Sequence, residues 1–69
     1  MKLSARNQLK GRIVEIQEGA VNAIVKINIG NDNILTADIT LQSVKDLGLT
    51  VGKEVVAVIK STSVMVGVE

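Results

Sequence analysis

The chain has 69 residues, a formal net charge of +1, and neither cysteine nor histidine. Disulfides, thiolate or imidazole metal sites, and catalysis by a cysteine or a serine–histidine pair are therefore excluded. The near balance of basic and acidic residues disfavours a protein that relies on non-specific phosphate contacts. Aromatic residues are absent, which disfavours a single-strand nucleic-acid binder, because such proteins stack bases on aromatic rings.

The apolar content, 46%, is high for so short a chain. A single domain over residues 1–69 has too little interior to bury that many apolar side chains, so we expect an obligate oligomer. The longest unbroken apolar run, Val55–Ile59, is far too short to span a bilayer, and no signal-peptide pattern opens the chain. We therefore expect a cytoplasmic protein without a membrane partner.

Alternating apolar and polar residues predict three strands in the first part of the chain. The first covers residues 8–17, with Val14 and Ile16 on one face and Ile13 on the other. The second covers residues 20–29, and the third starts near Leu35. Residues 30–33, Gly-Asn-Asp-Asn, tolerate positive φ and predict a hairpin turn between the second and third strands.

The apolar period changes after the third strand. Leu41, Val44 and Leu47 have helical spacing, which predicts a short helix with Thr40 or Gln42 at its start and a stop at Gly48. A fourth strand is predicted over residues 54–60, apolar and buried on both faces, and a fifth over residues 64–68. This order predicts a mainly all-β fold, a five-stranded OB-like small barrel with one short helix between strands 3 and 4.

Hydrogen-bond donors gather in two stretches, residues 4–11 and 60–63, and hydroxyls recur at the predicted helix start. A helix start also offers unpaired backbone N–H groups. A tetrahedral oxyanion only accepts hydrogen bonds, so it needs several donors, some positive charge and no nearby carboxylate. We predict that such a site forms across a subunit boundary from Ser4, Arg6, Thr40, Ser43, Lys60 and Ser61.

The same residues also have a purely structural interpretation. Arg6 and Lys60 could be ordinary surface charges, and the hydroxyls near residue 40 could simply cap the helix. Asn7 and Gln8 are expected to satisfy backbone groups at the entrance to the first strand or at an interface. The acidic residues are scattered and the glycines form no phosphate-binding loop, so we expect a non-enzyme without an organic cofactor.

The strings SARNQLKG (residues 4–11) and VIKSTSVMV (residues 58–66) resemble the two signatures of the molbindins. These are small molybdate-binding proteins built from a single TOBE-like, OB-type domain, and the resemblance covers essentially the whole chain. It implies a cytoplasmic homo-oligomer, a hexamer arranged as a trimer of dimers, that binds molybdate or tungstate at subunit interfaces. It also implies that Ser4 and Arg6 of one subunit meet a neighbour's Thr40, Ser43, Lys60 and Ser61, with no protein ligand to the metal itself.

The resemblance implies a free-standing form that stores or buffers the oxyanion, because the chain has neither a helix-turn-helix pattern nor a P-loop. An alternative is an OB-type nucleic-acid or protein-interaction module without an oxyanion ligand, which would be expected to carry aromatic residues or a basic stripe. A third possibility is a structural oligomer with no ligand. We expect the partners to be copies of the same chain and a small inorganic oxyanion, with no nucleic acid.

Overall fold

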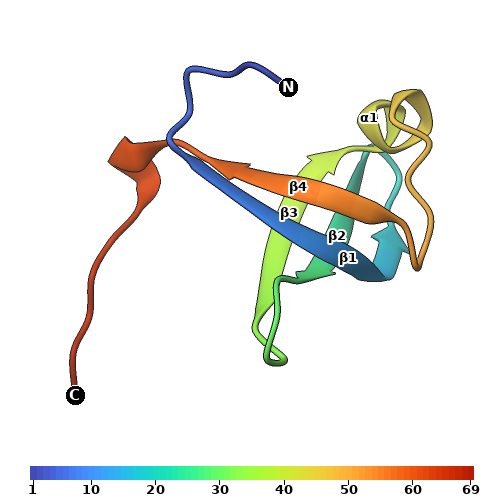
Figure 1. The fold of residues 1–69 in the computed structure, drawn as a ribbon. Helices are drawn as coiled ribbons and strands as arrows, with labels where there is room; N and C mark the ends of the chain where they lie inside the picture. The colour runs from blue at the N-terminus through green and yellow to red at the C-terminus, as the bar shows by residue number, and fades with distance from the viewer.

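Three antiparallel strands follow one another along the first part of the chain, and a fourth returns beside the first. A computed structural model describes all residues, 1–69, and gives β1 (Asn7–Glu18), β2 (Asn22–Asn28), β3 (Ile34–Thr40) and β4 (Glu54–Ile59). Their order in the sheet is β3-β2-β1-β4, and every neighbouring pair is antiparallel. The sheet curls into a half-barrel, with helix α1 (Leu41–Asp46) between β3 and β4 (Figure 1). The predicted OB-like, mainly β class is confirmed.

Strand β1 differs from its predicted alternation. A β-bulge between Ile13 and Glu15 shifts its register against β2. Ile13 is buried and Ile16 is half-buried, whereas Val14 is exposed. The prediction that Val14 and Ile16 share a face was wrong, because the extra residue of the bulge turns both isoleucines toward the core.

The turn and the helix follow their sequence signals. Asn31 and Asp32 have positive φ, and the backbone N–H of Asn33 donates to the carbonyl of Gly30 at 2.9 Å. Helix α1 begins after Thr40, its N-cap, and gives way at Gly48, whose φ is +61°. Thr40 was one of the two predicted helix starts, and Gly48 was the predicted stop.

The core lies on the concave side of the curled sheet and remains open. Only 6 of 69 residues are fully buried, namely Ile13, Ala23, Val25, Ile27, Val44 and Ala57. Strands β3 and β4 form the two edges of the sheet and do not pair with each other. A mainly apolar cavity of about 810 Å³ lies on this side, lined by residues of both edge strands, such as Leu35, Ile39, Val55 and Ile59.

The predicted fifth strand is the main difference from the expected barrel. After β4, a short 3₁₀ turn η1 (Ser61–Ser63) redirects the chain, and residues 64–69 run away from the half-barrel as an extended tail (Figure 1). Met65, Val66 and Val68 are each more than 90% exposed, at 92%, 92% and 94%. Four strands form instead of five because a strand needs a partner edge, and the tail touches none in a single chain.

The second difference concerns β4. Val55, Ala57 and Ile59 face the concave side, as the alternation predicted. Val56 and Val58 were expected to be buried on the other face, but they are 36% and 45% exposed. A single half-barrel has no second layer to cover its convex side, so that prediction was wrong for the isolated chain.

Candidate functional site

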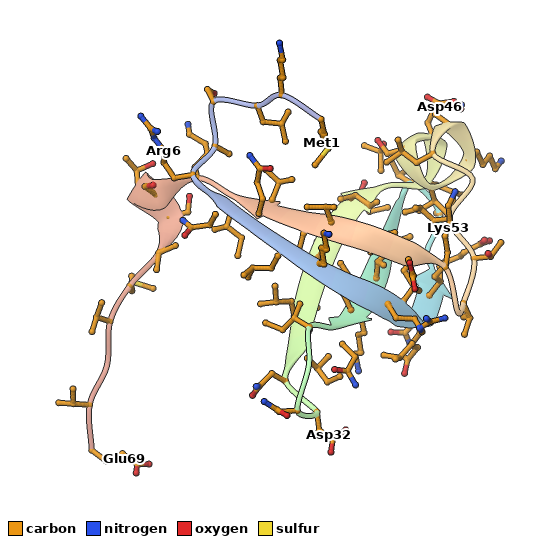
Figure 2. The ribbon with its side chains drawn as sticks, viewed as in Figure 1. Met1, Arg6, Asp32, Asp46, Lys53 and Glu69 are labelled. Carbon is orange, nitrogen blue, oxygen red and sulfur yellow. The ribbon has the colours of Figure 1, made fainter.

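Four of the six predicted site residues lie at one end of the β1–β4 pair. The ladder between these strands ends with Asn7 opposite Ile59. Arg6 therefore directly precedes the last pair on β1, and Lys60 directly follows it on β4. Figure 2 shows Arg6 beside the start of η1, in which Ser61 is the first residue. Ladder and turn thus bring Arg6, Lys60 and Ser61 to one end of the strand pair, and Ser4 lies two residues before Arg6. We call these four residues the terminal cluster.

The donors of the terminal cluster are not engaged by other side chains. The ion pairs of the structure are Arg12–Glu54 at 2.9 Å and Lys26–Glu15 at 3.8 Å, so neither Arg6 nor Lys60 has a carboxylate partner. All four residues of the cluster are exposed. Two positive charges and two hydroxyls are therefore free to meet a ligand that accepts hydrogen bonds and carries negative charge.

The other two predicted residues form a separate group at the start of α1, the helix-start cluster of Thr40 and Ser43. The Thr40 hydroxyl accepts a hydrogen bond from the backbone N–H of Ser43 at 3.0 Å and donates to the Ser43 hydroxyl at 2.8 Å. Thr40 is thus occupied as the N-cap, as the structural interpretation predicted. The Ser43 hydroxyl still has its own proton to donate.

The two clusters lie at opposite ends of β4 within one chain. α1 leads into β4 at Glu54, whereas Lys60 follows its last residue (Figure 1). A strand of this length spans about 20 Å, so one chain does not bring the helix-start cluster to the terminal cluster. The resemblance grouped Lys60 and Ser61 with Thr40 and Ser43 in one subunit, and Ser4 and Arg6 in its neighbour. Within the single chain, Lys60 and Ser61 lie instead at the end of the sheet that carries Arg6. The order of the strands alone could have revealed the separation, because α1 and η1 flank opposite ends of the same strand.

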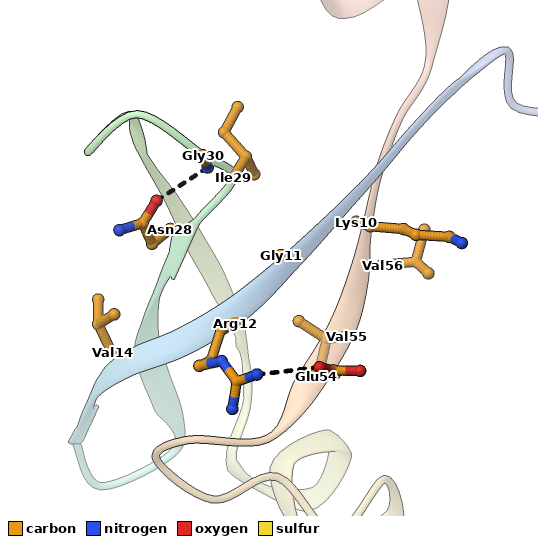
Figure 3. A pocket seen from close by; sticks show the side chains of 10 residues that line it. All are labelled: Lys10, Gly11, Arg12, Val14, Asn28, Ile29, Gly30, Glu54, Val55 and Val56. Carbon is orange, nitrogen blue, oxygen red and sulfur yellow. Dashed lines mark hydrogen bonds and ion pairs between the residues drawn. The ribbon is translucent and has the colours of Figure 1, made fainter.

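A second hollow is found on the outer side of the sheet, with a volume of about 660 Å³, and it also contains basic residues. Figure 3 shows Arg12 turned toward Glu54, and its guanidinium also donates to the carbonyl of Gly52 at 2.9 Å. The Glu54 carboxylate lines the hollow together with Lys10. A carboxylate at this position opposes a bound anion, so the terminal cluster is the better candidate.

Two further observations bear on the class of protein. No group of three or more acidic side chains lies close enough together to hold a metal ion. The only α-helix is α1, and no helix in the structure has the length and apolar character needed to cross a membrane.

Comparison with known proteins gives the family. The TOBE domain model matches residues 3–66. The probable molybdenum-pterin-binding protein of Haemophilus influenzae is 62% identical over 69 residues, which is 100% of both chains. The structure of a molybdate-binding protein from Sporomusa ovata superposes with a TM-score of 0.89 at 39% identity, covering 96% of this chain and 97% of that one.

A third comparison includes a bound ligand. The cytoplasmic molybdate-binding protein ModG, solved with molybdate bound, superposes with a TM-score of 0.83 at 52% identity. The match covers 88% of this chain and 43% of ModG. The fold and these similarities define an OB-like TOBE domain. The chain belongs to the TOBE family, and its resemblance to the molbindins is confirmed.

Proposed function

We propose that this chain binds molybdate or tungstate as an intact oxyanion, as a homo-oligomer in the cytoplasm, and stores or buffers it without catalysing a reaction. Residues 1–69 act as one binding domain in this proposal. The observation that carries it is the terminal cluster, in which Arg6 and Lys60 flank the end of the β1–β4 ladder without a carboxylate partner. The molybdate-binding proteins to which the chain is similar support the choice of anion.

The terminal cluster supplies the charge that the site needs. A dianion of tetrahedral shape accepts hydrogen bonds on all four oxygens, and Arg6 and Lys60 together balance its charge. Ser4 and Ser61 add two neutral donors. These residues are exposed in the single chain, so the cluster alone does not exclude water from the anion.

A second copy of the chain would complete the enclosure. We propose that a neighbouring copy brings its helix-start cluster, Thr40 and Ser43, to the terminal cluster. The separation of the two groups along β4 supports an intermolecular site, because one chain cannot supply both at one point. Ser43 would donate its remaining hydroxyl proton to an oxygen of the anion. The backbone N–H groups of Leu41 and Ser43 are already engaged, by the Val21 carbonyl and the Thr40 hydroxyl.

The open side of the half-barrel supports the homo-oligomer. The tail alternates with period two, with Val64, Val66 and Val68 on one face, and it is exposed in the single chain. The edges of β3 and β4 are both unpaired and border the apolar cavity. A tail of six residues spans about 20 Å, enough to lie along either edge, so we propose that the tail of one copy fills the open side of another. A hexamer of three such dimers is the assembly that we propose.

Equilibrium dialysis tests the proposed function. The protein is dialysed against molybdate, tungstate and sulfate in parallel, and the metal or sulfur retained is quantified. Retention of molybdate and tungstate well above sulfate is the expected result, because the larger anions fit a preformed site that sulfate leaves partly unfilled. Retention of none of them would overturn the proposal. Binding to single-stranded RNA at physiological salt, without molybdate binding, would favour the interaction-module alternative.

A further inference from the structure

Two amide side chains next to the terminal cluster form hydrogen bonds with the backbone on either side of it. The Asn7 side chain donates from Nδ2 to the carbonyl oxygen of Ile59 at 3.2 Å and is half-buried. The Gln8 side chain donates from Nε2 to the carbonyl oxygen of Ala5 at 3.0 Å. The acceptor of the Asn7 bond, Ile59, directly precedes Lys60. The acceptor of the Gln8 bond, Ala5, lies between Ser4 and Arg6.

The Asn7 bond acts at the last pair of the regular ladder, and the Gln8 bond acts beyond it. Asn7 opposite Ile59 is the last pair of the β1–β4 ladder, and residues 1–6 belong to no strand or helix. Residues 4 and 6 lie in bends, so no ladder bond holds Ser4 or Arg6 in place. The side chain of Gln8 therefore provides a local constraint on the segment that carries both donors, and that of Asn7 clamps the end of β4 that carries Lys60.

We infer that Asn7 and Gln8 are positioning residues that set the spacing of the oxyanion donors, and that they thereby determine selectivity for the larger tetrahedral anions over sulfate. This inference rests on the proposed function. Neither amide needs to touch the anion, because each acts on a carbonyl beside a donor. Donors held at a fixed spacing favour the anion that fills the gap, whereas mobile donors adapt to either size.

Isosteric changes separate the amide groups from the volume of the side chains. Asn7→Leu and Gln8→Met remove the donors and keep approximately the same size. The chain offers matched controls, because Asn22 donates from Nδ2 to Asp38 Oδ1 at 3.0 Å and Gln42 donates from Nε2 to Asp46 Oδ1 at 2.8 Å. Asn22→Leu and Gln42→Met therefore each remove one amide hydrogen bond outside the terminal cluster.

Dissociation constants for molybdate and sulfate are measured for the parent, both variants and both controls. We expect each variant to bind molybdate about tenfold more weakly with sulfate binding nearly unchanged, so that the selectivity ratio falls by a similar factor. The controls keep the ratio of the parent. A second measurement needs no ligand: ¹⁵N relaxation should show larger fast motion of residues 4–6 in Gln8→Met than in Gln42→Met.

The outcomes distinguish the two proposals. A parent protein that binds no oxyanion overturns the proposed function. A parent that binds molybdate, with variants whose selectivity matches that of the controls, overturns the positioning role alone. A fall in unfolding temperature with unchanged selectivity and unchanged motion of residues 4–6 also overturns it, because it assigns the two amides a purely structural role.

Discussion

The terminal cluster and the helix-start cluster differ in what their polar groups already do. Arg6 and Lys60 have no partner in the folded chain, whereas the Thr40 hydroxyl is engaged twice at the start of α1. Burying or binding a free charge changes its environment greatly, but a capping hydroxyl mainly stabilises its own helix. The comparison indicates that ligand affinity should depend most on the terminal cluster, and folding stability more on the helix start.

Replacement of Arg6 should produce the largest effect. Arg6→Ala leaves an enclosed dianion without one of its two charge-assisted partners, and we expect a loss of about 2–5 kcal/mol in the binding of molybdate. Arg12→Ala is the matched control, because the Arg12 guanidinium is already paired with Glu54. Calorimetric titration with molybdate measures both. If Arg12→Ala weakened binding as much as Arg6→Ala, the effect would be one of general charge and not of the terminal cluster.

The tail should decide whether copies assemble. Val66→Asp places a charge on a side chain that is 92% exposed in the single chain, so the isolated fold should tolerate it. In the proposed oligomer that charge would be buried in the open side of another copy, and we expect the assembly to dissociate. Val51→Asp, at a position that is 64% exposed, is the control. Sedimentation velocity reports the mass of each; equal masses for Val66→Asp and the parent would contradict an intermolecular role of the tail.

Loss of the helix cap should have a smaller effect, and mainly on stability. Thr40→Ala removes the acceptor for the Ser43 N–H, and we expect the free energy of unfolding to fall by about 1 kcal/mol. Thr50→Ala, an exposed threonine without a side-chain hydrogen bond, is the control and should change little. Urea denaturation of both variants gives the comparison. A molybdate affinity that falls more in Thr40→Ala than in Arg6→Ala would reverse the ranking of the two clusters.

The smallest effect should come from pH. The chain has no histidine, which is the side chain that ordinarily titrates near neutrality. We therefore expect molybdate affinity to change by less than about threefold between about pH 6 and pH 8. Dialysis at three pH values checks this. A steep change in that interval would mean that a group in or near the site titrates there.

Features that depend on neighbouring residues along the chain were predicted correctly from the sequence. Features that depend on the pairing of distant strands were not. The strand within residues 20–29 and the cap at Thr40 are local features, and both predictions were confirmed. The bulge in β1 is a property of its register with β2, which alternation within β1 does not reveal. Residues 64–68 have strand-like alternation, but a strand forms only beside a partner edge, and the single chain does not supply one.

The same distinction applies to the candidate site, whose residue types were predictable and whose arrangement was not. Sequence identified the donor residues by their chemistry, and pairing of β1 with β4 brings four of them to one end of the sheet. The separation of Thr40 and Ser43 from the other four was not predicted, because it depends on the direction of β4 between α1 and η1. Asn7 and Gln8 were predicted to satisfy backbone groups, and their bonds to Ile59 and Ala5 confirm it.

The most direct test is to locate the anion in a crystal of the assembled protein grown with molybdate. Anomalous scattering identifies molybdenum independently of the protein atoms. The account predicts a peak within hydrogen-bonding reach of the Arg6 guanidinium and the Lys60 ammonium, with Ser43 of a neighbouring copy on its other side. A peak in the hollow between Lys10 and Glu54, or none at the terminal cluster of a fully loaded protein, would contradict it.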